Sequence, residues 1–193
     1  MTREEWLLAM AQALRLPFKA AGYPLPAALR ISCGWPSHRA LASPSSKSRA
    51  IGQCWPTQAS ADGHNEIFIS PCISDAAQVA AVLVHELAHA AVGCQHGHKG
   101  PFRCCALRVG LTGKMTQTTA TPQLAERLNA LAAEIGPYPH ATLDRSQAKK
   151  QGTRMLKLTC PQCGYTVRTT RQWIEKGMPT CPCGEEMQEE GAA

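Results

Sequence analysis

The residues best suited to chemistry are two histidines and a glutamate, His85, Glu86 and His89, in the sequence HELAH. Side chains four positions apart lie on one face of a helix, so the two imidazoles could bind one metal ion. Zinc lowers the pKa of a bound water to about 7, and a neighbouring carboxylate can take the proton of that water as it attacks a carbonyl. The pattern therefore predicts a catalytic zinc site with Glu86 as the general base.

The sequence around this motif favours a metal site over a solvated polar stripe that carries two histidines by chance. The flanking segment 79–92 is apolar apart from the three motif residues. Burying two histidines and a glutamate among such residues is costly unless a partner satisfies them. We therefore expect the segment to be buried and its polar side chains to bind an ion.

The third ligand is expected shortly after the motif, because a catalytic zinc site has three protein ligands and one open position. The stretch 95–102, with the sequence QHGHKGPF, contains two candidates, His96 and His98. The three-ligand requirement alone leaves both of them open.

Four of the ten cysteines occur as two close pairs, Cys160 with Cys163 and Cys181 with Cys183, and a glycine follows each pair. Two such pairs bind structural zinc tetrahedrally, and the glycines relieve crowding where backbone amides turn toward sulfur. We therefore expect a zinc ribbon. The scattered cysteines are expected to be small buried hydrophobes; they are Cys33, Cys54, Cys72, Cys94, Cys104 and Cys105.

These motifs together resemble the SprT-like domain, which is shared by SprT proteins and the Spartan DNA–protein crosslink proteases. That family follows HExxH with a short loop and then Gly-His-Gly-x-x-Phe, and Gly97, His98 and Phe102 match this order. Lys99 stands where the family usually has glycine. The resemblance implies that His98, rather than His96, completes the catalytic zinc site.

The resemblance covers about residues 65–110 and 156–187, since SprT-like proteins often carry a C-terminal zinc ribbon. It implies an α+β, zincin-like (SprT-like) domain with a small antiparallel sheet and an active-site helix, followed by a small zinc-ribbon domain. It also implies a zinc metallopeptidase with one catalytic and one structural Zn²⁺, whose protein substrates are associated with DNA.

Basic residues between Asp144 and Glu175 suggest a DNA contact, because no acidic residue lies between those two positions. Lysine and arginine neutralise phosphates, and Tyr165 and Trp173 could stack on unpaired bases. We expect Trp173, however, to lie in the small core of the ribbon. The alternative is an ordinary solvated linker. The candidate DNA-binding residues are Lys149, Lys150, Arg154, Lys157, Arg168 and Arg171.

Two other functions are compatible with these motifs. A DNA-binding or transcription-associated adaptor would keep the first zinc only for folding, with Cys94 or His96 closing the fourth coordination position. Glu86 argues against this alternative, because a purely structural site gains nothing from a carboxylate beside the zinc. A zinc hydrolase that acts on a substrate other than a peptide is the second alternative.

Helices and short strands are expected to position these residues. A capping box of Thr2 and Glu5 opens a helix that we expect to end at Pro17. Strands are expected at Leu29–Cys33, Ala50–Trp55 and Glu66–Ser70. The motif helix is expected from Asp75 to about Cys94, and further helices from Pro101 to near Gly110 and from Pro122 to Ile135.

The composition indicates a folded chain, with 44% hydrophobic and 18% charged residues among 193. We expect a metallopeptidase domain at 1–140, a linker at 141–153 and the ribbon at 154–193. The net charge of +6 permits nucleic acid as a partner. No membrane association is expected, because the most apolar stretch, 76–93, contains the zinc motif. The start of the chain does not read as a secretory signal, and paired cysteines indicate metal ligands in a reducing compartment, so we expect a cytoplasmic protein.

Overall fold

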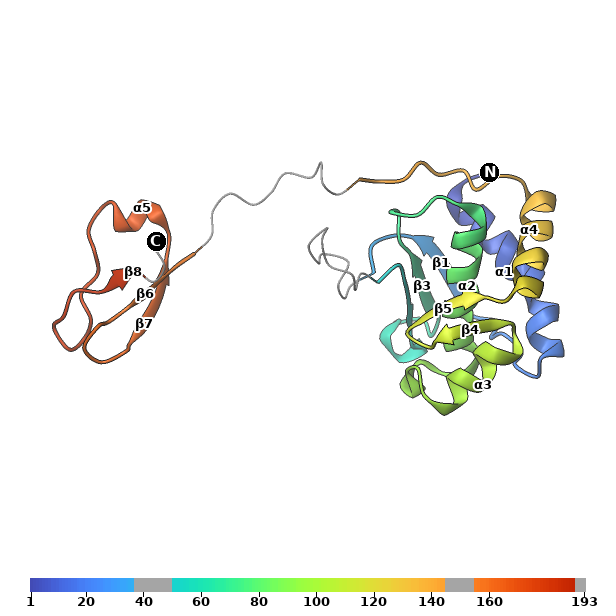
Figure 1. Ribbon diagram of the computed structural model, residues 1–193, viewed down its shortest axis with the longest axis horizontal. Helices are drawn as coiled ribbons and strands as arrows, with labels where there is room; N and C mark the ends of the chain where they lie inside the picture. Colours follow the sequence, from blue (N-terminus) through green and yellow to red (C-terminus); the bar gives the residue numbers. More distant parts are fainter. Residues whose placement is uncertain (37–49, 145–154, 190–193) are drawn as a thin grey trace. The chain divides into compact units, whose positions relative to one another are not determined.

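A computed structural model describes residues 1–36, 50–144 and 155–189 (Figure 1). The chain divides into two units, Met1–Ser146 and Gln147–Ala193. The division falls inside the segment that the sequence analysis interprets as a linker. Each unit has its own core, so each is described by itself.

Helix α1 (Arg3–Ala20) begins at the capping box, where the Thr2 hydroxyl accepts a hydrogen bond from the Glu5 amide at 3.1 Å. The expectation that this helix ends at Pro17 is wrong, because Pro17 lies inside it. A proline in a helix removes one backbone donor. The next side chain, Phe18, is fully buried, and this packing compensates for the lost hydrogen bond.

The sheet of the first unit has three strands, β1 (Leu29–Cys33), β2 (Gly52–Trp55) and β3 (Asn65–Ile69), in the order β1-β3-β2. Strand β2 pairs antiparallel with β3, whereas β1 pairs parallel with β3. The sheet is therefore mixed, and the expectation of an antiparallel sheet holds only for β2 and β3. The short 3₁₀ turn η1 (Thr57–Ala59) lies between these two strands, and β2 is left at one edge.

Helix α2 (Ala76–Val92) is the central element of this unit and matches the expected motif helix. The Asp75 carboxylate caps it by accepting a hydrogen bond from the Gln78 amide at 2.7 Å. The helix packs against β2 and β3 as well as α1, α3 and α4, which explains its apolar sequence. Within the described ranges, no helix is both long enough and apolar enough to cross a membrane.

The chain after α2 forms a short 3₁₀ turn, two helices and a hairpin. These are η2 (Cys94–His96), α3 (Gly100–Arg108), β4 (Leu111–Lys114), β5 (Gln117–Ala120) and α4 (Pro122–Ile135). Helices α3 and α4 were expected, but the β4–β5 hairpin was not. Its sequence, LTGKMTQTTA, is polar and mostly exposed, so no strong alternation of apolar residues marks the strands.

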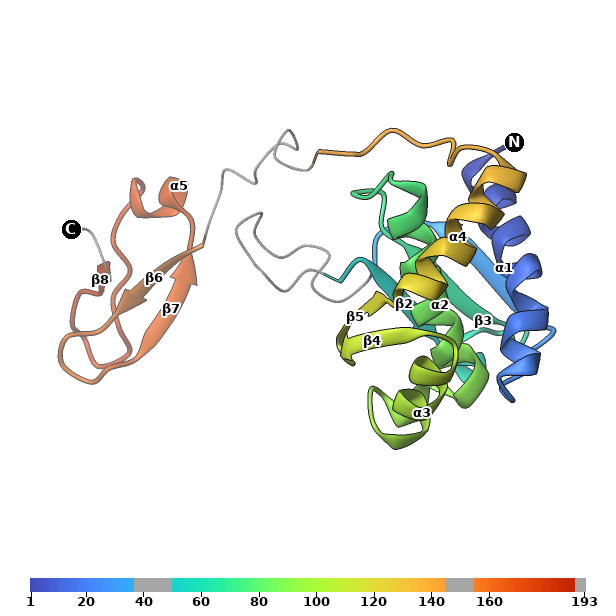
Figure 2. The ribbon, with the colours of Figure 1, turned by 45° about the vertical axis from the view of Figure 1, so that its right-hand side comes forward.

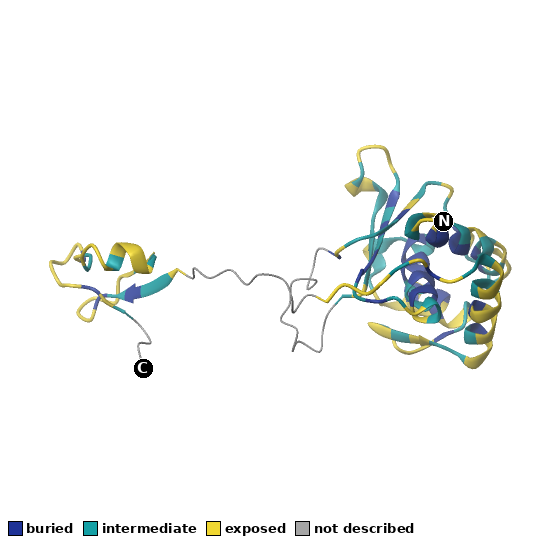
Figure 3. Cartoon of the chain, turned by 90° about the horizontal axis from the view of Figure 1, so that it is seen from above, coloured by how far each residue is buried: buried dark blue, intermediate teal, exposed yellow. Residues whose placement is uncertain are grey.

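The core of the first unit lies between α1, the sheet and α2. The buried side of α1 contributes Trp6, Met10, Leu14 and Phe18 among others, and α4 runs beside α1 (Figure 2). The Trp6 indole donates a hydrogen bond to the carbonyl of Gly136 at 2.8 Å, which joins the two helices. Figure 3 shows buried residues on the inner sides of the helices and exposed residues on their outer sides.

The second unit is a small three-stranded sheet with one helical turn. Its elements are β6 (Leu156–Thr159), β7 (Thr166–Thr169), α5 (Arg171–Ile174) and β8 (Gln188–Glu189), with the strand order β7-β6-β8. Its fully buried apolar side chains are few, and two of them are cysteines: Leu158, Cys160, Cys181 and Met187. A core of this size needs an additional constraint to be stable.

Candidate metal centres

Helix α2 presents His85, Glu86 and His89 on its side facing β2 and the hairpin, and the following turn brings His98 back to them. Gly93 ends the helix with φ +94°, and Gly97, with φ +52°, redirects the chain just before His98. Both are left-handed conformations that glycine adopts without steric cost. The break after α2 therefore places a fourth polar side chain beside the helix.

The three histidines converge through their Nε2 atoms. The Nε2 of His98 lies 3.2 Å from the Nε2 of His85 and 3.3 Å from the Nε2 of His89. Nitrogens bound tetrahedrally to zinc at about 2.05 Å are about 3.3 Å apart. The donor set and its spacing therefore fit a metal ion of this kind, and His96 does not belong to the group.

Phe102 forms the apolar support of the three imidazoles. Its ring centroid lies 4.1 Å from that of His89, in a stacked arrangement, 4.9 Å from that of His85 and 5.1 Å from that of His98. The Phe102 side chain is fully buried at the start of α3. Because it contacts all three rings, it restricts their rotation and fixes where their nitrogens point.

Thr118, on strand β5, holds the ring of His85 from the other side. Its Oγ1 lies 2.8 Å from Nδ1 of His85. When Nε2 of a histidine binds a metal, Nδ1 carries the hydrogen and needs an acceptor that sets the tautomer and the ring orientation. The Thr118 hydroxyl supplies this acceptor, so the unexpected hairpin contributes to the site.

Burial keeps the histidines in the neutral form that binds metal. It lowers the pKa of His85 to about 4, with a smaller contribution from the charge of His98. It also lowers the pKa of His89 to about 3, with smaller contributions from the other two rings, and lowers that of His98. Three imidazoles at these distances cannot all be protonated, and a lone pair on each Nε2 can face a common cation.

Glu86 is only 6% exposed and points toward strand β2. Its carboxylate accepts a hydrogen bond from the backbone amide of Cys54. The pKa of Glu86 is raised to about 8, mainly by burial and to a smaller extent by the neighbouring Cys94, while the Cys54 amide opposes the increase. A cation at the histidines would favour the ionised carboxylate.

The close approach of β2 to Glu86 depends on Gly52. A Cβ at this position would lie 2.4 Å from Oε1 of Glu86 and 2.7 Å from Cγ1 of Val82. No other residue fits without displacing the carboxylate or the strand. Glycine at this place therefore sets the distance between the edge strand and the motif helix.

A pocket of about 920 Å³ opens over these residues. Residues 50–54 line one side, and Lys114, Thr116, Gln117 and Thr118 of the hairpin line the other. The histidines and Glu86 lie within its lining. The three-histidine group is therefore open to a space large enough for a substrate.

Most of the scattered cysteines are not the small buried hydrophobes that we expected. Only Cys105 is fully buried; Cys104 is exposed, and the other four are half-buried. Cys54 and Cys94 line the pocket, where their Sγ atoms are 3.4 Å apart. The expectation failed because burial of a lone cysteine depends on tertiary packing, which its sequence neighbours do not specify.

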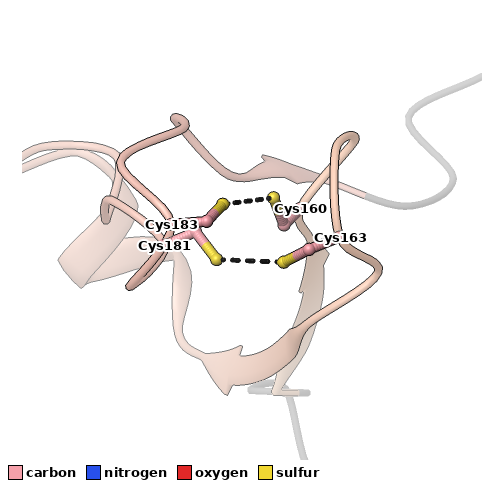
Figure 4. A group of neighbouring side chains, drawn as sticks. All are labelled: Cys160, Cys163, Cys181 and Cys183. Carbon is pink, nitrogen blue, oxygen red and sulfur yellow. Dashed lines mark hydrogen bonds between the residues drawn. The ribbon is translucent and has the colours of Figure 1, made fainter.

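The four paired cysteines converge in the second unit (Figure 4). Sγ of Cys160 is 3.5 Å from Sγ of Cys183, and Sγ of Cys163 is 3.4 Å from Sγ of Cys181. All four sulfurs lie within 4.8 Å of one another, and sulfurs around a tetrahedral zinc are about 3.8 Å apart. These four thiols are therefore a candidate structural metal site.

The two cysteine pairs form similar turns. The Cys160 amide donates to the carbonyl of Tyr165 at 2.8 Å, and the Cys181 amide donates to the carbonyl of Glu185 at 2.7 Å. The amide of Cys163 donates to the Cys160 sulfur and is the largest cause that lowers the pKa of that thiol to about 7; the Gln162 amide and the neighbouring thiols contribute, and burial opposes them. Backbone amides directed at sulfur stabilise the thiolate, which is the form that binds metal.

The candidate DNA-binding residues differ in where they lie and what they contact. Lys149, Lys150 and Arg154 lie outside the described residues. Arg171 forms a bidentate ion pair with Glu189, in which both N···O distances are 2.7 Å.

Lys157 and Arg168 lie directly opposite each other on β6 and β7.

The aromatic side chains of the second unit are exposed. Trp173 is 60% exposed, so the expectation that it belongs to the ribbon core is wrong, and Tyr165 is 50% exposed. Trp173 lies on the single turn of α5, which is too short to bury it against the sheet. Both rings are therefore accessible from solvent.

Sequence reasoning missed Thr118 and Gly52, which orient His85 and Glu86. Neither belongs to a motif, and each reaches the site through a strand that pairs with another segment of the chain. From the sequence, Cys54 is predicted only as one of the scattered thiols. No family model, curated protein or solved structure that was compared with this chain matches it.

Proposed function

We propose that this chain is a zinc-dependent metallopeptidase of SprT type that acts on DNA-associated proteins. The observation that carries the proposal is the convergence of three Nε2 atoms, at 3.2 and 3.3 Å, beside a buried glutamate in an open pocket. The donor set suits zinc, and the carboxylate suits general-base catalysis.

Zinc held by His85, His89 and His98 would polarise the scissile carbonyl as a Lewis acid and would lower the pKa of a bound water. Glu86 accepts the proton of the attacking water and passes it to the leaving nitrogen of the peptide. The same carboxyl group serves as base and then as acid, because its pKa is raised by burial.

The other groups of the site keep these side chains in position. The Cys54 amide holds the Glu86 carboxylate against β2 by a hydrogen bond, and Gly52, which has no side chain, leaves room for it. Thr118 and Phe102 fix the histidine rings. An extended polypeptide would lie in the pocket between residues 50–54 and the β4–β5 hairpin.

The open position at the histidines favours an enzyme over an adaptor with a structural zinc. An adaptor would have Cys94 or His96 as a fourth ligand. Among the described residues, neither belongs to the three-histidine group: the Cys94 sulfur pairs with Cys54, and the His96 ring is 3.4 Å from the Gln95 amide nitrogen.

The second unit is proposed to contact DNA. Lys157 and Arg168 lie opposite each other on adjacent strands, so the two basic side chains can contact neighbouring phosphates. Tyr165 and Trp173 are exposed and can stack on unpaired bases. The described part of this unit has four basic and four acidic residues, so binding would depend on where the charges lie rather than on their sum.

The test is cleavage of a protein crosslinked to single-stranded DNA by the wild type and by Glu86→Gln. Both must first be shown to be folded and loaded with zinc. We expect cleavage by the wild type and a loss of at least about 10³-fold in Glu86→Gln, because the amide cannot accept the proton. Equal rates in the two proteins would contradict the role of Glu86, and DNA binding without cleavage by either would favour the adaptor.

The DNA contact is tested with the double variant Lys157→Gln/Arg168→Gln. We expect weaker binding of single-stranded DNA and a smaller salt dependence of the binding constant, since two phosphate contacts are lost. Lys176→Gln, which removes one charge from the end of the α5 segment, is the control. An unchanged salt dependence in the double variant would remove the second unit from the DNA-binding surface.

A further inference from the structure

A pair of thiols in the pocket wall takes no part in the proposed reaction. Cys54 lies on the edge strand β2, and Cys94 is the first residue of η2, directly after α2. Their Sγ atoms are 3.4 Å apart, and both side chains line the pocket. Both thiols are free and half-buried.

This pair differs from the other cysteines of the first unit. Among the described residues of Met1–Ser146, it is the one hydrogen bond between two sulfurs. The sulfurs of the second unit also lie close together, but there four thiols share one centre. Two thiols alone, without further ligands, are the arrangement from which a disulfide forms.

We propose that Cys54 and Cys94 form a redox modification site, which a small-molecule disulfide such as oxidised glutathione converts into an intramolecular disulfide across the pocket wall. The Cys94 sulfur loses its proton and attacks one sulfur of the oxidant, releasing one thiol. The Cys54 sulfur then loses its proton and attacks the Cys94 sulfur, releasing the second thiol. Two protein thiols are oxidised, and one oxidant disulfide is reduced to two thiols.

The contact between the two sulfurs favours this order of attack. The hydrogen bond between the two sulfurs lowers the pKa of Cys94, whereas the same contact, followed by burial, raises the pKa of Cys54. Cys94 is therefore the thiol that is more easily ionised. Cys54 is then held beside it as the resolving thiol.

Bond formation would move the turn that leads to His98. A disulfide has an S–S length of about 2.05 Å, so the two sulfurs, which are 3.4 Å apart, must approach each other by roughly 1 Å or more. Strand β2 is held by its ladder to β3, whereas η2 is a single turn between two glycines of positive φ, Gly93 and Gly97. We therefore expect η2 to move toward β2 and to displace His98 from the other two histidines.

The consequence for catalysis rests on the proposed peptidase function, but the modification itself does not. A displacement of about 1 Å in a catalytic group can cost about 10²-fold in rate. We expect the oxidised protein to cleave its substrate at least about tenfold more slowly than the reduced protein. A reductant should restore the rate, since the disulfide is the only covalent change.

The experiment treats the zinc-loaded full chain with oxidised glutathione, alkylates the remaining thiols and maps the peptides by mass spectrometry. We expect one crosslinked species that joins the Cys54 peptide to the Cys94 peptide. Cys54→Ser and Cys94→Ser should each abolish it. Cys104→Ser, which removes an exposed thiol of α3, should leave it unchanged.

Full alkylation of both thiols after treatment, or separate glutathione adducts without a link, would overturn the proposal. A link without a change in cleavage rate would overturn the displacement of His98 but not the modification site. Absence of cleavage by the reduced wild type would instead contradict the peptidase function, and the peptide map would still decide the fate of the two thiols.

Discussion

A single hydrogen atom at Gly52, in place of a side chain, lets strand β2 lie against the Glu86 carboxylate. We predict that Gly52→Ala lowers kcat/KM about 10²-fold, because its Cβ would lie 2.4 Å from Oε1 of Glu86. Zinc content should be retained, since the atoms nearest to the new methyl group belong to Glu86 and Val82 rather than to the histidines. Steady-state kinetics together with metal analysis would check both parts.

Gly100→Ala is the matched control for this substitution. Gly100 is a glycine near the site without a positive φ, and a Cβ there would meet no atom within 4 Å. Its kinetics and zinc content should equal those of the wild type. If both alanine variants lose activity to the same extent, the effect would come from general destabilisation rather than from the Glu86 carboxylate.

We expect the Thr118 hydroxyl to have a separate role, in metal binding. We predict that Thr118→Val, which keeps the shape but removes the hydroxyl, weakens zinc binding about 10- to 100-fold. The reason is that Nδ1 of His85, now 2.8 Å from Oγ1, would lose its hydrogen-bond partner. Competition with a chromophoric chelator measures the change. Thr118→Ser should restore most of the affinity, and equal affinities in all three proteins would contradict this role.

At the scale of elements, the amino-terminal cap of helix α2 should contribute to the stability of the fold without affecting the metal site. We predict that Asp75→Ala lowers the free energy of unfolding by about 1 kcal/mol, because the cap of the α2 amino terminus is lost. Zinc affinity of the folded protein should not change. Urea denaturation measures the effect, and Asp75→Asn, which can still cap, should cost much less.

The elements also show what the sequence can and cannot predict. Helix α2 and the two cysteine turns were predictable, because their signals are local: a capped apolar helix with histidines at i and i+4, and cysteine pairs followed by glycine. The β4–β5 hairpin and the parallel pairing of β1 were not, because both depend on partners distant in sequence. Thr118 and Gly52 were missed for the same reason.

At the scale of the whole molecule, the two units should respond differently to removal of metal. Among its described residues the second unit has four fully buried apolar ones, two of them cysteines, whereas the first has an extensive core of helices and sheet. We predict that a strong chelator unfolds the second unit and leaves the first folded, since thiols without metal cannot replace a core.

Limited proteolysis after chelation would check this prediction. The expected result is rapid cleavage within residues 155–189 and a protected fragment that contains α1 to α4. Added zinc should restore protection, and Cys160→Ser should reproduce the effect without chelator. Equal resistance of the second unit with and without metal would contradict a structural role for its four thiols.

The three histidines lie within 13 positions of one another along the chain, from α2 to the turn before α3. A segment this short can gather its ligands around an ion early, before the strands have paired. Gly52 and Thr118 arrive on strands from either side and can act only in the completed fold. On the proposed function, we therefore expect capture of the metal and competence for the reaction to be separate events in the maturation of the protein, so that a nascent chain would hold its ion before it could use it.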